Sequence, residues 1–169
     1  MSTYRIILRI AGCALPSLML SFASFAGPLA AASLSFTLAD FKAQVPQSPT
    51  GNFLMEIPQI LNTAADQEVR AVVAGCPVET CGQIIPETKF NPEGKRLRVA
   101  RSQVQCCATH AREYSVVLEF VEKAPALQEK DWVKLLGTLT YERQGEVFIT
   151  VIRVNEIQKT AQPQSPLLR

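Results

Sequence analysis

The feature that most constrains the fold of this chain is a repeated alternation of apolar and polar side chains. In the segment EYSVVLEFV, residues 113–121, every second side chain from Tyr114 to Phe120 is large and apolar. Because successive side chains of a strand point to opposite faces, this period of two indicates a strand with one buried face. Four further segments have a strand-like composition: residues 78–85, 96–106, 131–143 and 147–157. The sequence therefore predicts five antiparallel strands.

The segments between these strands suggest how they connect. NPEG, residues 91–94, and RQGE, residues 143–146, have the composition of turns. Residues 122–131 are polar and contain a proline, which fits a short helix or a loop. Gly137, inside the fourth strand, indicates a bulge or a bend at a barrel corner. Five strands with a short helical insert between the third and the fourth are the order of an OB-fold, a Greek-key barrel.

The predicted fold class is therefore mainly β: a small five-stranded OB-like antiparallel barrel with a short preceding helix. The pattern alone supports a barrel or a sandwich, and the OB assignment goes one step beyond it. The helix is predicted near residues 66–74, where three valines have helical spacing, Asp66 is an N-cap and Gly75 is a C-terminal stop. We expect these side chains to be buried: Leu118, Phe120, Val133, Leu135, Leu139 and Ile149.

The N-terminus has the order of a secretory signal. Arg5 and Arg9 are the only charged residues before position 40, and a long apolar run that ends in small residues follows them. Ala30 and Ala32 fit the −3 and −1 positions of a cleavage site before Ser33. The alternative is an uncleaved membrane anchor, since the run is long enough to span a bilayer. We expect a periplasmic or secreted protein or, if the signal stays, a domain anchored outside the cytoplasm.

This interpretation divides the chain into four parts. Residues 1–32 are the predicted signal peptide, and residues 33–52, which hold two prolines and little periodicity, are predicted to be a flexible linker. Residues 53–158 are the predicted OB-like barrel domain. Residues 159–169 are predicted to be a disordered tail.

The charge of the chain argues against nucleic acid as a partner. The chain has 17 Lys and Arg against 15 Asp and Glu, and removal of the signal takes two arginines and no acid. The remaining part is balanced, whereas a nucleic-acid binder needs an excess of cations to displace the counterions of the phosphates. We therefore expect no nucleic-acid binding.

Two adjacent cysteines and the single histidine of the chain are the strongest candidates for a site. Cys106 and Cys107 follow the second predicted strand, and His110 comes three residues later. Thiolate and imidazole are soft ligands that suit zinc or copper. The same set can form an activated thiol, because an imidazole lowers the pKa of a nearby cysteine. Structural packing, or a disulfide, is the third interpretation.

A second pair of cysteines, Cys76 and Cys81, has a simpler interpretation. The part of the chain after the predicted signal has four cysteines, an even number, so in an exported protein a disulfide that closes this short loop is the default. A bridge from one of this pair to Cys106 or Cys107 is a serious competitor, because the first two strands of an OB barrel are neighbours. A third possibility gathers Cys76 or Cys81 with Cys106, Cys107 and His110 around a metal.

Three motifs in this order resemble a bacterial family of unknown function. Arg101 in the second strand is followed by CCATHA, residues 106–111, and later by WVKLLGTL, residues 132–139. The chain is similar to the C-terminal soluble domain of YcgQ-type two-component predicted permease proteins, whose pattern is an Arg followed by Cys-Cys-Ala-x-Asp-Ala. Gly82 and Gly137 add weaker support, and the resemblance covers about residues 66–157.

The resemblance implies an OB-like domain that serves a separate membrane permease subunit. It also implies that the cysteine doublet is part of the site. Arg101, on the strand that leads to the doublet, can hold a thiolate or an anionic ligand by its charge, and the alternative is a solvated arginine. One departure is His110, which stands where the family pattern has Asp. Cys76 and Cys81 are not part of the pattern.

Enzyme signatures are otherwise missing from the sequence: it has no G-x-S-x-G, no phosphate-binding glycine-rich loop and no H-E-x-x-H. The favoured function is an exported binding or accessory module that is not an enzyme, with Arg101, Cys106, Cys107 and His110 as its ligand or metal contacts. The alternative is a thiol-redox or cysteine-nucleophile protein that uses Cys106 or Cys107 with His110.

Export is directly testable. Mass spectrometry of the secreted or periplasmic fraction should find a mature N-terminus at Ser33 or, from the second possible cleavage position, at Gly27. A full-length chain recovered from the cytosol would contradict the prediction.

Overall fold

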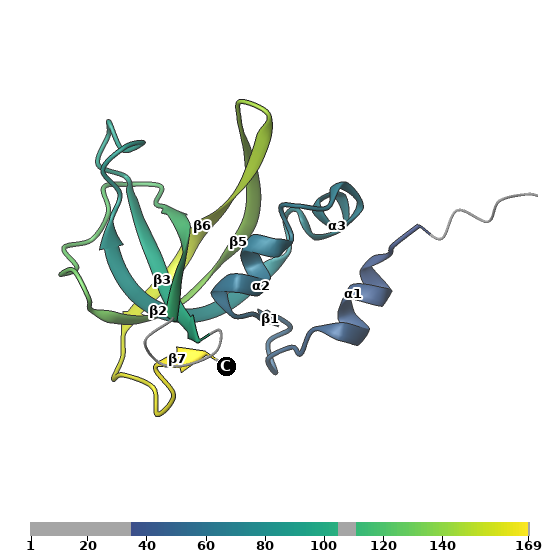
Figure 1. The fold of residues 1–169 in the computed structure, drawn as a ribbon, viewed down its shortest axis with the longest axis horizontal. Helices are drawn as coiled ribbons and strands as arrows, with labels where there is room; N and C mark the ends of the chain where they lie inside the picture. The colour runs from purple at the N-terminus through teal and green to yellow at the C-terminus, as the bar shows by residue number, and fades with distance from the viewer. Residues whose placement is uncertain (1–34, 105–110, 169) are drawn as a thin grey trace, which may run out of the picture. The chain divides into compact units, whose positions relative to one another are not determined.

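The computed structural model describes residues 35–104 and 111–168. Within them the strands and helices follow one another as shown in Figure 1. The elements are α1 (Leu38–Gln44), β1 (Phe53–Leu54), α2 (Ile57–Asn62), α3 (Gln67–Val73), β2 (Pro77–Pro86), β3 (Arg96–Val104), β4 (Ala111–Glu119), β5 (Trp132–Gln144), β6 (Val147–Lys159) and β7 (Leu167–Leu168). The five long strands match the five predicted segments to within about two residues at each end. No helix of the described part is long and apolar enough to cross a membrane.

The five long strands form a closed barrel. The sheet has the order β1-β2-β5-β6-β4-β3-β7, and an additional pairing of β2 with β3 closes the ring. β4 and β6 run parallel, whereas the other neighbours in the ring are antiparallel. This Greek-key connection of five strands is that of the OB-fold. The predicted fold class is confirmed.

A glycine marks the place where the barrel bends. The register of β5 against β6 shifts between Leu136 and Gly137. A Cβ on Gly137 would lie 2.5 Å from the carbonyl oxygen of Arg153 and would also collide with Ile152. No other residue fits there. The irregularity predicted at Gly137 is present, but the residue left without a partner in this register is Asn155 of β6, opposite Leu136 and Gly137.

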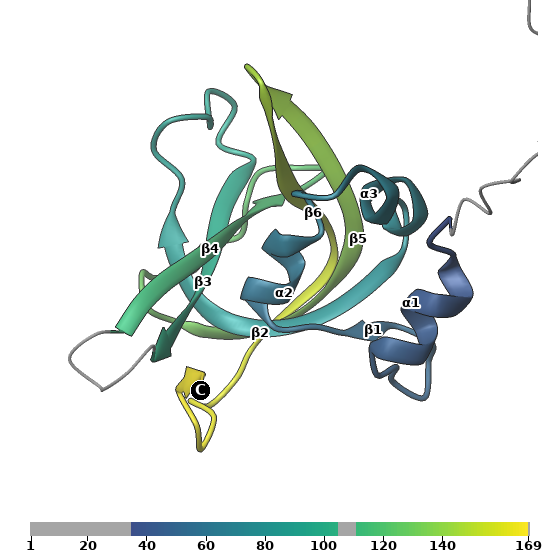
Figure 2. The ribbon, with the colours of Figure 1, turned by 45° about the vertical axis from the view of Figure 1, so that its right-hand side comes forward.

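A short helix fills one end of the barrel. Ile57 and Ile60 of α2 are fully buried, and α2 packs on β4, β3, β2 and β6 (Figure 2). We expected a helix or a loop between the third and fourth barrel strands, and residues 120–131 form a loop. The helix that closes the core therefore precedes the barrel. Its six residues are too few to show a helical period in the sequence.

The predicted helix near residues 66–74 is present as α3. The carboxylate of Asp66 accepts hydrogen bonds from the backbone N–H groups of Glu68 and Val69, which satisfies two of the free donors at the helix start. Gly75 has a φ of +82°, the left-handed conformation that ends a helix.

Two short elements lie in the segments predicted to be the linker and the tail. Residues 38–44, inside the predicted linker, form α1, which begins with a capping box and buries Phe41 against Phe53 at a ring-centroid distance of 4.8 Å. Residues 167–168, inside the predicted tail, form β7, which pairs with Ser102 and Gln103 of β3. Both elements are held by tertiary contacts, which periodicity within such short segments does not reveal.

The predicted core is mostly right. Leu118, Val133, Leu135 and Leu139 are at most 1% exposed. Phe120 is only partly buried, because it lies just past the end of β4 and packs at the margin of the core. Ile149 is also only partly buried. It lies out of phase with the core residue Ile152, since β6 carries apolar side chains on both faces and its pattern did not determine the phase.

Leu135 provides a test of the core. Leu135→Ala should lower the free energy of unfolding by about 2–5 kcal/mol, because it removes buried methyl groups and leaves a cavity. Val121→Ala is the control, since Val121 is 89% exposed and its truncation should change stability by less than about 0.5 kcal/mol. Denaturant unfolding measures both variants, and similar small losses in the two would contradict the assigned core.

Candidate functional site

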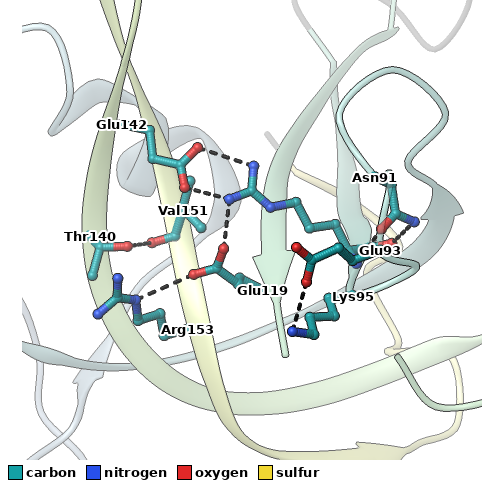
Figure 3. Close-up of polar contacts among 9 residues, drawn as sticks. Asn91, Glu93, Lys95, Glu119, Thr140, Glu142, Val151 and Arg153 are labelled. Carbon is teal, nitrogen blue, oxygen red and sulfur yellow. Dashed lines mark hydrogen bonds and ion pairs between the residues drawn. The ribbon is translucent and has the colours of Figure 1, made fainter. Parts of the chain in front are cut away.

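One end of the barrel carries a network of ion pairs that crosses four strands. Arg96 of β3 donates to Glu119 of β4 at 2.6 Å and to Glu142 of β5 at 2.5 and 3.1 Å. Arg153 of β6 donates to the other oxygen of Glu119 at 3.3 Å. Figure 3 shows Glu119, Glu142 and Arg153 pointing toward one another between the strands. The network ties β3 to β5, which are not neighbours in the sheet.

A cleft of about 640 Å³ lies beside this network, under the loop between β2 and β3. Its cations are largely paired: Lys95 contacts Glu93 at 2.8 Å, and Arg96 is held by the network. Nearby Arg98 donates to Glu87 at 2.9 Å. OB-folds that bind oligonucleotides use a face of the barrel and its neighbouring loops. Such binding depends on Lys and Arg side chains that are available to contact phosphates. Lys95, Arg96 and Arg98 instead contact carboxylates of this chain.

The pairing also shifts the acidity of the network. The hydrogen bond from Arg96 lowers the pKa of Glu119, although partial burial opposes the shift. The two carboxylates in turn raise the pKa of Arg96. Burial would raise the pKa of Glu87, but the hydrogen bonds from Arg98 and from two backbone N–H groups outweigh it, so the pKa is lowered.

The end of β3 carries a different kind of arginine. Arg101 is only 6% exposed, and its Nη2 donates to the backbone carbonyl of Ser165 at 3.0 Å. Its guanidinium lies 5.3 Å from the ring centroid of Trp132. Within the described residues, the carboxylate paired with it is that of Glu56, at 4.0 Å, which is beyond hydrogen-bond distance. Its Nε is buried and has no hydrogen-bond partner among the residues that the structure describes.

A cleft of about 210 Å³ is connected to this arginine through Glu56, which lines the cleft and approaches Arg101 to 4.0 Å, whereas Arg101 itself is not part of the cleft wall. Glu56, Thr80 and Cys81 line it, together with Glu79 and Lys134, which form an ion pair at 2.5 Å. The Thr80 hydroxyl is buried and, like Arg101 Nε, has no hydrogen-bond partner. Buried polar groups are normally satisfied, so each of these two groups needs an explanation.

Cys81 is a neutral thiol in this environment. Burial raises its pKa, and the positive charge of Arg101 offsets only part of that effect. Burial likewise raises the pKa of Cys76. Neither thiol has the lowered pKa that marks a reactive cysteine.

The structure corrects the prediction of a local disulfide between Cys76 and Cys81. Both are free thiols, and Cys81 lies within the extended strand β2, which begins at the residue after Cys76. Five extended steps separate their Cα atoms by about 16 Å, whereas a disulfide needs less than about 7 Å. The loop that we expected them to close is a strand.

Of the four predicted ligand contacts, the structure places Arg101. Cys106, Cys107 and His110 lie outside the described residues. The described residues contain no group of three or more His, Cys, Asp or Glu side chains that could hold a metal.

Sequence reasoning did not identify Glu56 or Trp132 as neighbours of Arg101, and it did not identify Thr80 as a buried polar residue. One signal was available: Thr80 is a polar residue in phase with Val78 and Ile84, which face the core. Glu56 and Trp132 come from distant parts of the chain, and only the closed barrel brings them to Arg101.

The family model described as the DUF1980 C-terminal domain matches residues 53–168, and the chain belongs to this family. Among curated proteins none matches the chain. Among solved structures, the small single-stranded DNA-binding protein from Streptomyces coelicolor is similar at 13% identity and a TM-score of 0.36, with 51% of this chain and 93% of that chain covered.

The lowered pKa of Glu119 predicts a dependence of stability on pH. A carboxyl whose pKa is lower in the folded state stabilises the fold above its unfolded pKa of about 4.3, and the contribution is lost as the pH falls through the folded pKa. Glu119→Gln should therefore cost about 1–3 kcal/mol at pH 7, and stability should fall less steeply below pH 4.5 than in the wild type.

Denaturant unfolding between pH 3 and 7 measures this difference. Glu146→Gln is the matched control, because Glu146 is an exposed acid in the turn between β5 and β6. If Glu119→Gln and the control have the same acid profile as the wild type, the network does not stabilise the barrel.

Proposed function

We propose that this member of the DUF1980 C-terminal domain family is an exported binding module that serves a membrane permease subunit. The closed OB-like barrel fits a module that holds a ligand on a rigid scaffold. The basic and apolar N-terminus supports export. The resemblance to the soluble domain of YcgQ-type proteins supports a permease partner.

The observation that carries this proposal is the state of Arg101. Among the described residues, the buried guanidinium of Arg101 has no partner for its Nε and no carboxylate within hydrogen-bond distance. Burying a charge in this way costs folding free energy. Such a cost is expected where the charge has a task other than stability. Arg101 is also part of the motif on which the resemblance to the YcgQ-type family rests.

The proposed contact set adds Cys106, Cys107 and His110 to Arg101. β3 is described as far as Val104 and β4 from Ala111, so the three residues lie in the connection between these strands. Two thiolates and an imidazole suit zinc or copper. Because the described residues hold no other metal-ligand cluster, a metal would depend on this connection.

The alternative partner class, nucleic acid, has less support. The charge of the chain without its signal is balanced, and the cations beside the large cleft are largely paired with carboxylates. We therefore propose a small ligand or metal, and a protein partner in the membrane.

Metal uptake tests the proposed contact set. Purified reduced protein should bind zinc or copper in a fixed ratio, measured by titration and elemental analysis. Cys106→Ser, Cys107→Ser and His110→Ala should each weaken binding, whereas Cys76→Ser is the control and should leave it unchanged. Uptake that is the same in all three variants would remove the metal from the proposal.

A further inference from the structure

We propose that Arg101 holds a small carboxylate anion in the 210 Å³ cleft bounded by Glu56, Thr80 and Cys81. This inference rests on the proposed function as a binding module and names the ligand chemistry of its Arg101 end. It depends only on residues that the structure describes, and not on Cys106, Cys107 or His110.

The first argument is that the hydrogen-bond and charge partners of Arg101 are incomplete among the described residues. Its side chain is only 5% exposed, so water does not replace a missing partner. Nη2 donates to a neutral acceptor, the Ser165 carbonyl, and the Trp132 ring faces the guanidinium at 5.3 Å. Neither contact supplies a negative charge, and Nε has no acceptor. A guanidinium and a carboxylate match in geometry and charge, so a carboxylate supplies what is missing.

The second argument is the position of Glu56. Its carboxylate approaches Arg101 to 4.0 Å, too far for a hydrogen bond, and its side chain is 49% exposed. A carboxylate can therefore reach Arg101 from the cleft, and this one makes no hydrogen bond with Arg101, although the Glu56 side chain also takes part in the capping box of α2. We infer that Glu56 is an internal competitor that a ligand carboxylate displaces into solvent.

The third argument is the composition of the cleft wall. The Thr80 hydroxyl is buried without a partner and can donate to an anion. Glu79 is neutralised by Lys134 at 2.5 Å, and Cys81 is a neutral thiol because burial raises its pKa. Of the two acids that line the cleft, Glu56 is the one whose ion-pair partner, Arg101, is 4.0 Å away.

The volume limits the size of the ligand. At 210 Å³ the cleft is smaller than the roughly 300–1,000 Å³ of pockets that hold drug-sized molecules. A short monocarboxylate fits this space. The site therefore selects small carboxylates over nucleotides and large cofactors.

The test is a titration of the metal-free, ¹⁵N-labelled full chain with sodium acetate, at constant ionic strength kept with sodium chloride. The Nε–H resonance of Arg101, assigned from its loss in Arg101→Lys, should shift and saturate. Acetate should also slow the alkylation of Cys81 by iodoacetamide, measured on the Cys81 peptide by mass spectrometry, because both occupy one cleft. Alkylation of Cys76 is the internal control and should not change.

Three variants sharpen the result. Glu56→Gln should bind acetate about fivefold more tightly or better, because it removes the competing charge 4.0 Å from Arg101. Thr80→Val should bind it at least about tenfold more weakly, because it removes a hydrogen bond to a charged group. Glu146→Gln, an acid remote from the cleft, should bind like the wild type.

Several outcomes would overturn the proposal. One is a resonance that does not saturate in either the wild type or Glu56→Gln. Another is an acetate affinity that does not differ between Glu56→Gln and Glu146→Gln. Phosphate or sulfate that binds more tightly than acetate would also reject the carboxylate. Because the Thr80 and Glu56 variants keep Arg101, the test survives if Arg101→Lys does not fold. Loss of metal uptake in the Cys106, Cys107 and His110 variants with normal acetate binding would separate this site from the metal contact.

Discussion

The barrel depends on the pairing of β2 with β3, which closes the ring. Gly82 makes this pairing possible: a Cβ at that position would lie 2.6 Å from the carbonyl oxygen of Ala100 and 2.7 Å from a methyl group of Val99. The two strands can approach only because the side chain is absent. The last register pair, Gln83 with Ala100, comes directly before Arg101 along β3. The closure that completes the core therefore also buries the arginine of the candidate site.

The two ends of the barrel differ in how their charges are satisfied. At one end Arg96 meets two carboxylates and joins β3 to β5 across the barrel, so each charge has a partner at short distance. At the other end Arg101 has a carboxylate only at 4.0 Å, and its Nε is unpartnered. The first arrangement stabilises the fold. The second leaves binding energy for a ligand, because the cost of burying the charge has already been met by folding.

How much the sequence predicts depends on the length of each element. The five long strands, the irregularity at Gly137 and the helix that begins after Asp66 follow from local patterns, and the structure confirms them. The short elements α1, α2 and β7 were not predicted, since each is too short for a period and is held by distant contacts. The disulfide between Cys76 and Cys81 was predicted from spacing along the chain, and it is wrong because an extended strand lies between the two residues.

The candidate site was predicted only in part, for the same reason: local patterns do not reveal contacts between distant segments. The identity of Arg101 as a candidate came from its place in a motif, but its burial and its missing partners depend on Trp132, Ser165 and Glu56. These residues lie at separations of 31, 64 and 45 positions from Arg101, so no local pattern connects them. The closed ring brings together a cation, an unpartnered hydroxyl and a loosely held acid. In the proposed site, an outside anion competes with the carboxylate of Glu56 for this buried positive charge.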